Sequence, residues 1–408
     1  MNRRDFCTTS AATLATTAFF PRALGADTPK SLSDTQAPFG NATTAHPADT
    51  AQGQFYVPRS KPQPVVKAGE FVFAAAHCDH GHIYGMCEGL TNAGATLKWI
   101  FEPDEAKRTA FLKRFPQAKA ARSLDEILLD GTVQLVAAAA ITHLRGPLGC
   151  RVMEAGKDYF TDKAPFTTLP QLADAREVAA RTGRKYMVYY SERLHNEAAM
   201  YATDILEQGV IGRVLQIVSL APHRLSKPTR PAWFFEREKF GGILCDIGSH
   251  QFEQFLTYSK ARDATITQSA IANFANPDKP EFEDFGETSL LGDNGCSNYV
   301  RVDWFTPDGL STWGDGRTFI LGTEGTIELR KYVDLAREKT GGHVYIVDGK
   351  GERHVNVSGQ IGFRFFGEFI LDCLHRTEKA MTQAHAFKAT ELALKAQAAA
   401  KKIEGLRG

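Results

Sequence analysis

"AAAHCDHGHIYG", Ala74 to Gly85, joins an apolar run to a segment with helical spacing. The apolar residues before and within it predict a buried strand, and residues 81–94 predict a helix that ends at Gly94. Dinucleotide-binding folds carry three glycines, spaced G-x-G-x-x-G, at such a junction. Measured back from Gly81, the first two glycine positions hold Ala76 and Cys78. The stretch therefore predicts the first unit of such a fold, with an altered phosphate loop.

Strand-like and helix-like segments go on alternating up to residue 190, which predicts a parallel, doubly wound sheet. The pattern changes after Ser191. A helix over residues 196–212 is followed by strand-like runs, separated by turn signals such as Asp293-Asn294-Gly295. Such signals are typical of antiparallel hairpins. A final helix is expected over residues 384–402.

The N-terminal residues are not expected to belong to the fold. Arg3 and Arg4 precede an Ala/Thr-rich stretch, and residues 1–26 resemble a twin-arginine export signal, which carries folded proteins out of the cytoplasm. A basic disordered N-terminus is the alternative. Residues 27–66 lack periodicity and predict a linker. We expect domains at 67–190 and 191–408, and a periplasmic or otherwise extracytoplasmic protein.

Composition restricts the partners. The chain has 408 residues, enough for two domains, and a net charge of +1, which gives no reason to expect nucleic acid as a partner. No later apolar stretch is long enough to span a bilayer, so no integral membrane span is expected once the signal is removed. The seven cysteines form no C-x-x-C pair, which favours buried thiols over a disulfide framework.

The next predicted strand ends in Glu102, 21 residues after Gly81. An acidic residue at this distance holds the adenosine ribose hydroxyls and repels a 2′-phosphate. Glu102 therefore favours NAD over NADP. The alternative is an ordinary exposed acid at the end of a strand.

The loop is rich in possible metal ligands, namely His77, Cys78, Asp79, His80 and His82. Adjacent residues rarely converge on one ion, and none of the established zinc spacings is present. We expect no metal site, and we expect the histidines to contact the phosphates of the cofactor through ring N–H groups.

A second motif, "GGILCDIGSH", covers Gly241 to His250. Asp246 and His250 are four residues apart and share the polar side of a predicted helix. Lys163 follows the predicted strand at 157–160, at the carboxyl edge of the parallel sheet, where doubly wound folds bind ligands.

Together these motifs resemble the Gfo/Idh/MocA family, the relatives of glucose–fructose oxidoreductase and inositol dehydrogenase, from about Phe71 to the C-terminus. The family pattern G-G-x-x-x-D-x-G-x-H matches in full. The E-K-P motif reads Asp162-Lys163-Ala164, and the phosphate loop matches only at its last glycine. The resemblance implies an α/β fold with an N-terminal Rossmann sheet. It also implies a C-terminal α/β domain whose large, open, mostly antiparallel sheet shapes the substrate site and a homo-oligomer interface.

The resemblance further implies an NAD(P)-dependent oxidoreductase that acts on a secondary hydroxyl of a sugar, glycoside or polyol. The export signal predicts a tightly bound cofactor, because the cofactor has to be loaded before export, and Cys78, His77 and His80 could close over the pyrophosphate and slow its release. His250, with an ordinary pKa of ~6.5, would accept the hydroxyl proton. Asp246 would orient it, and Lys163 would hydrogen-bond the reacting oxygen. Family members differ over which of the three takes the proton, and the choice stays open.

The complete site prediction has three parts. The catalytic residues are Lys163, Asp246 and His250. The cofactor-binding residues are Ala76, His77, Cys78, His80, Gly81, His82, Glu102 and Lys163. The substrate-binding residues are Arg193, His195, His223, Trp233, Asp246 and His250.

Two other functions stay open. One is a glycoside-cleaving enzyme in which bound NAD oxidises a ring carbon, permits elimination and is then restored. The other is a carbohydrate-binding protein that keeps the fold without the cofactor, which the altered loop favours and the retained Lys163, Asp246 and His250 oppose.

Overall fold

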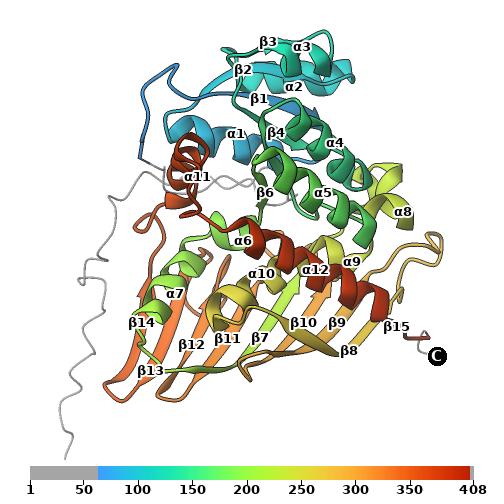
Figure 1. The fold of residues 1–408 in the computed structure, drawn as a ribbon. Helices are drawn as coiled ribbons and strands as arrows, with labels where there is room; N and C mark the ends of the chain where they lie inside the picture. The colour runs from blue at the N-terminus through green and yellow to red at the C-terminus, as the bar shows by residue number, and fades with distance from the viewer. Residues whose placement is uncertain (1–62, 405–408) are drawn as a thin grey trace, which may run out of the picture.

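A computed structural model describes residues 63–404 of the chain, which form two β-sheets with helices around and between them (Figure 1). The predicted export signal and nearly all of the predicted linker lie outside the described residues. No helix among residues 63–404 combines the length and the apolar character that crossing a membrane requires.

The first sheet has six parallel strands, and it confirms the predicted doubly wound fold. Its order is β3-β2-β1-β4-β5-β6. The strands are β1 (Val72–Cys78), β2 (Thr96–Phe101), β3 (Lys119–Ala120), β4 (Leu135–Ala139), β5 (Asp158–Asp162) and β6 (Tyr186–Tyr189). They alternate with α1 (His82–Asn92), α2 (Glu105–Arg114), α3 (Leu124–Leu129), α4 (Thr142–Glu154) and α5 (Leu169–Thr182).

Sequence signals explain the core and the ends of these helices. The central strands carry runs of alanine, residues 74–76 and 137–140, which are fully buried and let helices approach both faces of the sheet. The side chains of Asp104, Ser123 and Thr168 accept hydrogen bonds from the first turns of α2, α3 and α5. Because the strands are parallel, their carboxyl ends lie along one edge, which forms one wall of the site described below.

The second sheet has nine strands in the order β14-β13-β12-β11-β7-β10-β9-β8-β15, and most neighbours are antiparallel, as predicted. The strands are β7 (Val214–Pro222), β8 (Ala264–Ala272), β9 (Phe285–Gly292), β10 (Ser297–Asp303), β11 (Arg317–Gly322), β12 (Gly325–Arg330), β13 (His343–Asp348), β14 (Gly351–Asn356) and β15 (Lys401–Lys402). The predicted turn at residues 293–295 joins β9 to β10, and Gly295 supplies its positive φ of 83°. The polar edge strand β14 was not predicted.

The remaining helices are α6 (Ser191–Leu194), α7 (Glu197–Glu207), α8 (Arg237–Phe240), α9 (Ile243–Asp246), α10 (Gly248–Ser259), α11 (Arg364–His375) and α12 (Gln383–Ala399). Helices α6, α9, α10 and α12 lie between the two sheets (Figure 1). Short 3₁₀ turns, η2 (Lys227–Thr229) and η3 (Ala232–Phe235), lie in the long connection after β7.

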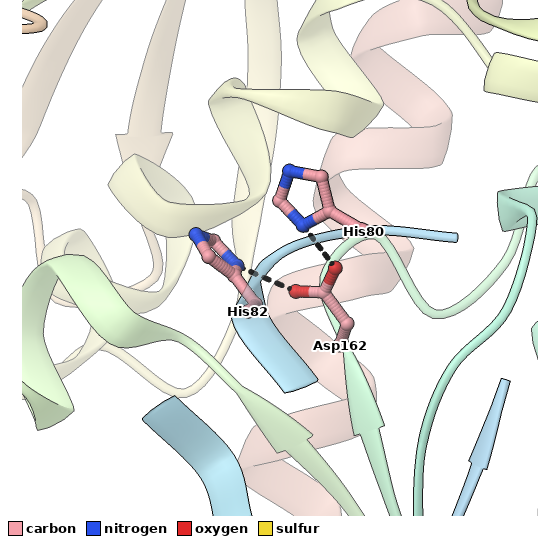
Figure 2. Close-up of side chains that lie close together, drawn as sticks. All are labelled: His80, His82 and Asp162. Atoms are coloured by element: carbon pink, nitrogen blue, oxygen red, sulfur yellow. Dashed lines mark hydrogen bonds and ion pairs between the residues drawn. The ribbon is translucent and has the colours of Figure 1, made fainter. Parts of the chain in front are cut away.

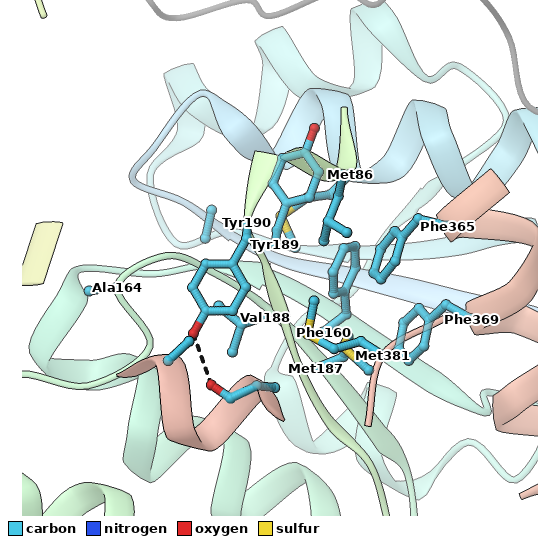
Figure 3. Close-up of a cluster of buried hydrophobic side chains, with 14 of the residues drawn as sticks. Met86, Phe160, Ala164, Met187, Val188, Tyr189, Tyr190, Phe365, Phe369 and Met381 are labelled. Carbon is cyan, nitrogen blue, oxygen red and sulfur yellow. Dashed lines mark hydrogen bonds between the residues drawn. The ribbon is translucent and has the colours of Figure 1, made fainter. Parts of the chain in front are cut away.

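Helix α11, which was not predicted, packs against the first sheet. Figure 3 shows its Phe365 and Phe369 beside Phe160 of β5, at ring-centre distances of 5.9 and 5.2 Å. Gly89 of α1 makes room for Phe366, because a Cβ at this position would overlap the phenylalanine ring. Since helices from the end of the chain pack on the N-terminal sheet, the domain limits at 67–190 and 191–408 stay predictions.

Candidate active site

A pocket lies where residues at the carboxyl edge of the first sheet face the second sheet and the helices between the two sheets. Helices α6, α9 and α10 contribute polar residues, and the loops of the second sheet contribute aromatic rings. Its lining residues are His80, His82, Thr142, Arg145, Lys163, Ser191, Glu192, His223, Arg224, Arg230, Trp233, Phe234, Asp246, His250, Trp304, Trp313 and Tyr332.

The structure brings the three predicted catalytic residues together in this pocket. Lys163 directly follows β5, and its Nζ donates a hydrogen bond to Oδ1 of Asp246 at 2.7 Å. Asp246 ends α9, and His250 lies in the first turn of α10. Oδ2 of Asp246 and Nδ1 of His250 are buried and have no hydrogen-bond partner among the described residues. Such buried polar atoms are normally paired, so both are available to a ligand.

Burial shifts the protonation of these groups. Desolvation lowers the pKa of His250 to about 3, aided by Lys163 and opposed by Glu192. The pKa of the imidazole therefore lies well below its unperturbed value of ~6.5, and the ring is uncharged at neutral pH. Burial alone would raise the pKa of Asp246, but Lys163 keeps it below its usual value. The pocket thus holds a carboxylate and a neutral imidazole.

Asp162, the residue before Lys163, is completely buried and holds three basic side chains. Nδ1 of His80 and Nδ1 of His82 lie 2.7 and 2.8 Å from its two oxygens, as Figure 2 shows. Nη2 of Arg145 donates to Oδ2 at 3.0 Å. Burial would raise the pKa of Asp162, but Arg145, His82 and His80 hold it well below the usual range. The side chain is therefore an anion that anchors the histidines of the loop.

The same group fixes the backbone of Lys163. Its N–H donates to Oδ1 of Asp162 at 2.7 Å, and the guanidinium of Arg145 donates to the carbonyls of Lys163 and Ala164. Arg145 thus acts on Lys163 as a positioning residue. Sequence reasoning missed it, because an arginine inside a helix carries no local signal of this contact.

These contacts change the interpretation of His80 and His82. We expected them to contact phosphates, but their Nδ1 atoms face Asp162 and both residues line the pocket. The three ligand atoms lie within 4.8 Å of one another, a spacing that a metal ion also uses. Arg145 already pairs with the Asp162 carboxylate at 3.0 Å, whereas burial lowers the pKa of His80 to about 4 and leaves its imidazole uncharged at neutral pH.

The start of α1 fits the phosphates of a dinucleotide. Gly81 is its N-cap, no side chain caps it, and its first turn has no acidic residue. The N–H groups of such a helix end are an anion site. Asp79 does not oppose a phosphate, because its carboxylate pairs with Lys107 at 2.6 Å. His77 adopts a positive φ of 60°, a conformation more usual for glycine, and Ala76 is buried within β1.

Glu102 is buried, so it is not the ordinary exposed acid at the end of a strand that was the alternative to a ribose-binding residue. Its two oxygens accept hydrogen bonds from the N–H groups of Cys78, at 2.5 Å, and Asp104, at 2.8 Å. The side chain thereby ties the end of β2 to the loop after β1, where a ribose lies in this type of fold. Burial and Glu102 raise the pKa of the Cys78 thiol, so it stays protonated. These residues fit a nicotinamide dinucleotide.

The predicted substrate residues divide into two groups. His223, Trp233, Asp246 and His250 line the pocket, whereas Arg193 and His195 do not.

The prediction for Arg193 and His195 needs correction. Nε of Arg193 donates to both oxygens of Glu253, at 2.8 and 2.9 Å, in a buried ion pair. His195 is fully buried against Phe363 and Phe366. The physical reason is that the short helix α6 turns these two side chains toward α10 and α11, away from the pocket.

Glu192 is a second pocket residue that sequence reasoning missed, next to the predicted Arg193. Its Oε2 accepts hydrogen bonds from Nζ of Lys331, at 2.5 Å, and Nε2 of Gln251, at 2.8 Å. Nε2 of His223 lies 3.5 Å from Oε1. Burial would raise the pKa of Glu192, but Lys331, His250 and His223 lower it to about 2. The pocket therefore has a second carboxylate beside His250.

Comparisons with known proteins agree with this geometry. The family model for the GFO/IDH/MocA C-terminal domain matches residues 200–328. The crystal structure of a "putative oxidoreductase" from Erwinia carotovora atroseptica is 49% identical, covers 82% of this chain and 100% of that chain, and superimposes with a TM-score of 0.80. The chain belongs to the Gfo/Idh/MocA family.

Other relatives of this Gfo/Idh/MocA chain are more distant. The scyllo-inositol 2-dehydrogenase (NAD(+)) of Bacillus subtilis is 23% identical over 70% of this chain and 78% of its own length. A levoglucosan dehydrogenase, solved with NADH and levoglucosan, shares the fold with a TM-score of 0.67 at 16% identity, over 81% of this chain and 97% of that one. Alignments to two further curated relatives span only 39% and 62% of those proteins.

Proposed function

We propose that this Gfo/Idh/MocA protein is an NAD(P)-dependent oxidoreductase that acts on a secondary hydroxyl of a carbohydrate. One observation carries the proposal: Lys163, Asp246 and His250 converge in one pocket at the carboxyl edge of a Rossmann sheet. The names of the relatives that act on inositol and levoglucosan support the substrate class.

The residues of the pocket divide the chemistry among them. The ammonium of Lys163, held by Asp246, hydrogen-bonds the reacting oxygen and favours its alkoxide-like transition state. Neutral His250 presents a ring nitrogen that can accept a hydrogen bond from the reacting hydroxyl, and the bound substrate has to raise its pKa for the imidazole to take the proton. When bound, the nicotinamide ring supplies the acceptor for the hydrogen on the alcohol carbon. Lys163 can receive the proton only after its ammonium has lost one, and the choice between Lys163 and His250 stays open.

We further propose that the cofactor is NAD and that it is held tightly. Support comes from Glu102, a buried carboxylate at the end of β2, where dinucleotide-binding folds hold the adenosine ribose and a negative charge repels a 2′-phosphate. The ion pair between Asp79 and Lys107 and the contact between Glu102 and Cys78 join the loop after β1 to the elements beside it. A loop held by side chains in this way restrains the opening that release of a nucleotide requires.

The nucleotide content of the purified protein tests this proposal. We expect the supernatant of dialysed, denatured protein to contain NAD or NADH, detected by mass spectrometry, because the loop slows dissociation of the cofactor.

The variant Glu102→Gln tests the choice of nucleotide. The ratio of the affinities for added NAD and added NADP should fall by about tenfold in this variant, since it loses one buried negative charge. NADP in the supernatant would contradict the role of Glu102. No nucleotide and no affinity for added NAD would favour a carbohydrate-binding protein, and release of a sugar from a glycoside without net NADH would identify the glycoside-cleaving alternative.

We propose export through the twin-arginine route, to the periplasm or another extracytoplasmic compartment. The support is the pair Arg3 and Arg4 before an Ala/Thr-rich stretch. Because this route moves folded proteins, cofactor is loaded before export. Replacing both arginines by lysine should retain the protein in the cytoplasm, measured by cell fractionation. Unchanged recovery in the periplasm would contradict the proposal.

We also propose a homo-oligomer formed through the face of the second sheet that points away from the helices. Apolar side chains are exposed on this face, namely Leu291, Phe319, Leu321 and Val347. Phe319→Asp should therefore reduce the mass measured by light scattering to that of a smaller species. A wild-type mass equal to that of one chain, at most 44.9 kDa for the full sequence, would contradict the proposal.

A further inference from the structure

Arg230 brings a positive charge to the pocket without a carboxylate beside it. It lies between η2 and η3, and its guanidinium carbon is 4.6 Å from the ring centre of Phe234 and 4.9 Å from that of Trp304. Its Nε donates to the carbonyl of Leu225 at 2.8 Å. These contacts fix the plane of the guanidinium. Its two terminal amino groups make no hydrogen bond to the described part of the chain.

The other cations of the pocket are compensated. Arg145 pairs with Asp162, Lys163 with Asp246, and Arg224 with Asp308, at 3.0, 2.7 and 3.5 Å. Among the lysines and arginines that line the pocket within residues 63–404, only Arg230 has no carboxylate within 4.0 Å.

The surroundings of Arg230 make this charge costly in the absence of a ligand. Arg230 is half-buried, and the burial of its guanidinium lowers its pKa to about 10, which Asp246 only partly offsets, so the group is still charged at neutral pH. An unpaired charge in a desolvated site is unfavourable, and an anion that binds there relieves this cost. The forked geometry of guanidinium matches the two oxygens of a carboxylate.

We propose that the substrate is a sugar acid whose carboxylate binds Arg230 while its reacting hydroxyl lies between Lys163 and His250. The assignment rests on the proposed function, because that function places a carbohydrate in this pocket. It deepens the proposal by naming the charge that the sugar carries. Arg230 is then a specificity-determining residue, since a neutral sugar of the same shape leaves its guanidinium unpaired.

Isothermal titration calorimetry with matched sugars tests the assignment. The probes are glucuronate and galacturonate against glucose and galactose, with glucose 6-phosphate as a second anion. We expect each uronate to bind the wild-type protein at least about tenfold more tightly than its neutral counterpart, as for hydrogen bonds to charged groups. Arg230→Gln should weaken uronate binding about 10- to 100-fold and change the affinity for the neutral sugars less than about twofold.

Two further variants act as controls. Lys227→Gln removes a charge from the same loop, but Lys227 pairs with Asp278 and does not line the pocket, so all affinities should be unchanged. Arg230→Lys keeps the positive charge but loses the forked guanidinium that binds both oxygens of a carboxylate. This variant should keep only part of the preference for uronates. Thermal unfolding of each variant shows whether it is folded.

Several results would overturn the assignment. They are equal affinity for uronates and neutral sugars, a preference that survives in Arg230→Gln, tighter binding of glucose 6-phosphate than of glucuronate, or no binding of any probe. If the affinities follow this pattern but no sugar is oxidised, the binding of a sugar acid to Arg230 is supported, and only the proposed oxidoreductase activity is contradicted.

Discussion

Replacement of Lys163 by methionine is expected to lower kcat about 100-fold or more, because the transition state loses the cation that stabilises the developing negative charge on oxygen. The same change leaves Asp246 as a buried carboxylate without its partner at 2.7 Å. Breaking a buried ion pair in this way costs about 3–5 kcal/mol of stability. Steady-state kinetics with a sugar that the wild type oxidises, together with thermal unfolding, measure the two effects.

A double variant separates chemistry from stability. In Lys163→Met/Asp246→Asn no unpaired charge is left, so we expect the melting temperature to recover while kcat stays about 100-fold low. His250→Ala should lower kcat by a similar factor, since it removes the neutral imidazole beside the reacting oxygen. Turnover near the wild-type rate in either single variant would remove that residue from the catalytic machinery.

A loss of stability between pH 7 and pH 5 is the second expected result. Burial lowers the pKa of both His195 and His250 to about 3, and neither is more than 1% exposed. In the unfolded chain both return to a pKa of ~6.5, so below this pH the unfolded chain binds protons that the folded protein does not. The stability that these two histidines contribute is fully present above pH 6.5 and is lost as the pH falls toward 3. The slope is about 1.4 kcal/mol per pH unit for each histidine.

Each of these histidines therefore removes about 2 kcal/mol between pH 6.5 and pH 5, a range in which carboxylates of the unfolded chain are still ionised. Urea unfolding at the two pH values measures the change. In His250→Gln, the free energy of unfolding should change by about 2 kcal/mol less between the two pH values than in the wild type. His375→Gln, a change at an exposed position, should leave the difference as it is in the wild type. A wild-type protein as stable at pH 5 as at pH 7 would show that these imidazoles are accessible to protons in the folded state.

The parts of the fold that repeat a local pattern were predictable. The alternation of strands and helices up to residue 190 identifies the parallel sheet, and the turn signal at residues 293–295 identifies an antiparallel hairpin. Strand β14 was missed because it is a polar edge strand without apolar alternation. Helix α11 was missed although residues 364–375 carry a local apolar spacing of the helical kind.

The same distinction applies to the site. The spacing of Asp246 and His250 on one helix side, and Lys163 at the end of a strand, are local features, and the structure brings all three together. Glu192 and Arg193 are adjacent, yet one faces the pocket and the other pairs with Glu253. The orientation of a four-residue helix is decided by what packs around it, so the sequence carried no signal for choosing between them.

Transfer of deuterium from a labelled sugar tests the central claim most directly, because it detects oxidation even where the net reaction is redox-neutral. The protein, supplied with NAD, is incubated with glucuronate or glucose in which deuterium replaces every carbon-bound hydrogen, and the reaction is stopped with base. We expect mass spectrometry to show reduced nucleotide about one mass unit heavier than NADH, with Lys163→Met forming about 100-fold less. Unlabelled nucleotide with both sugars, from protein that binds NAD and the sugar, would contradict the account.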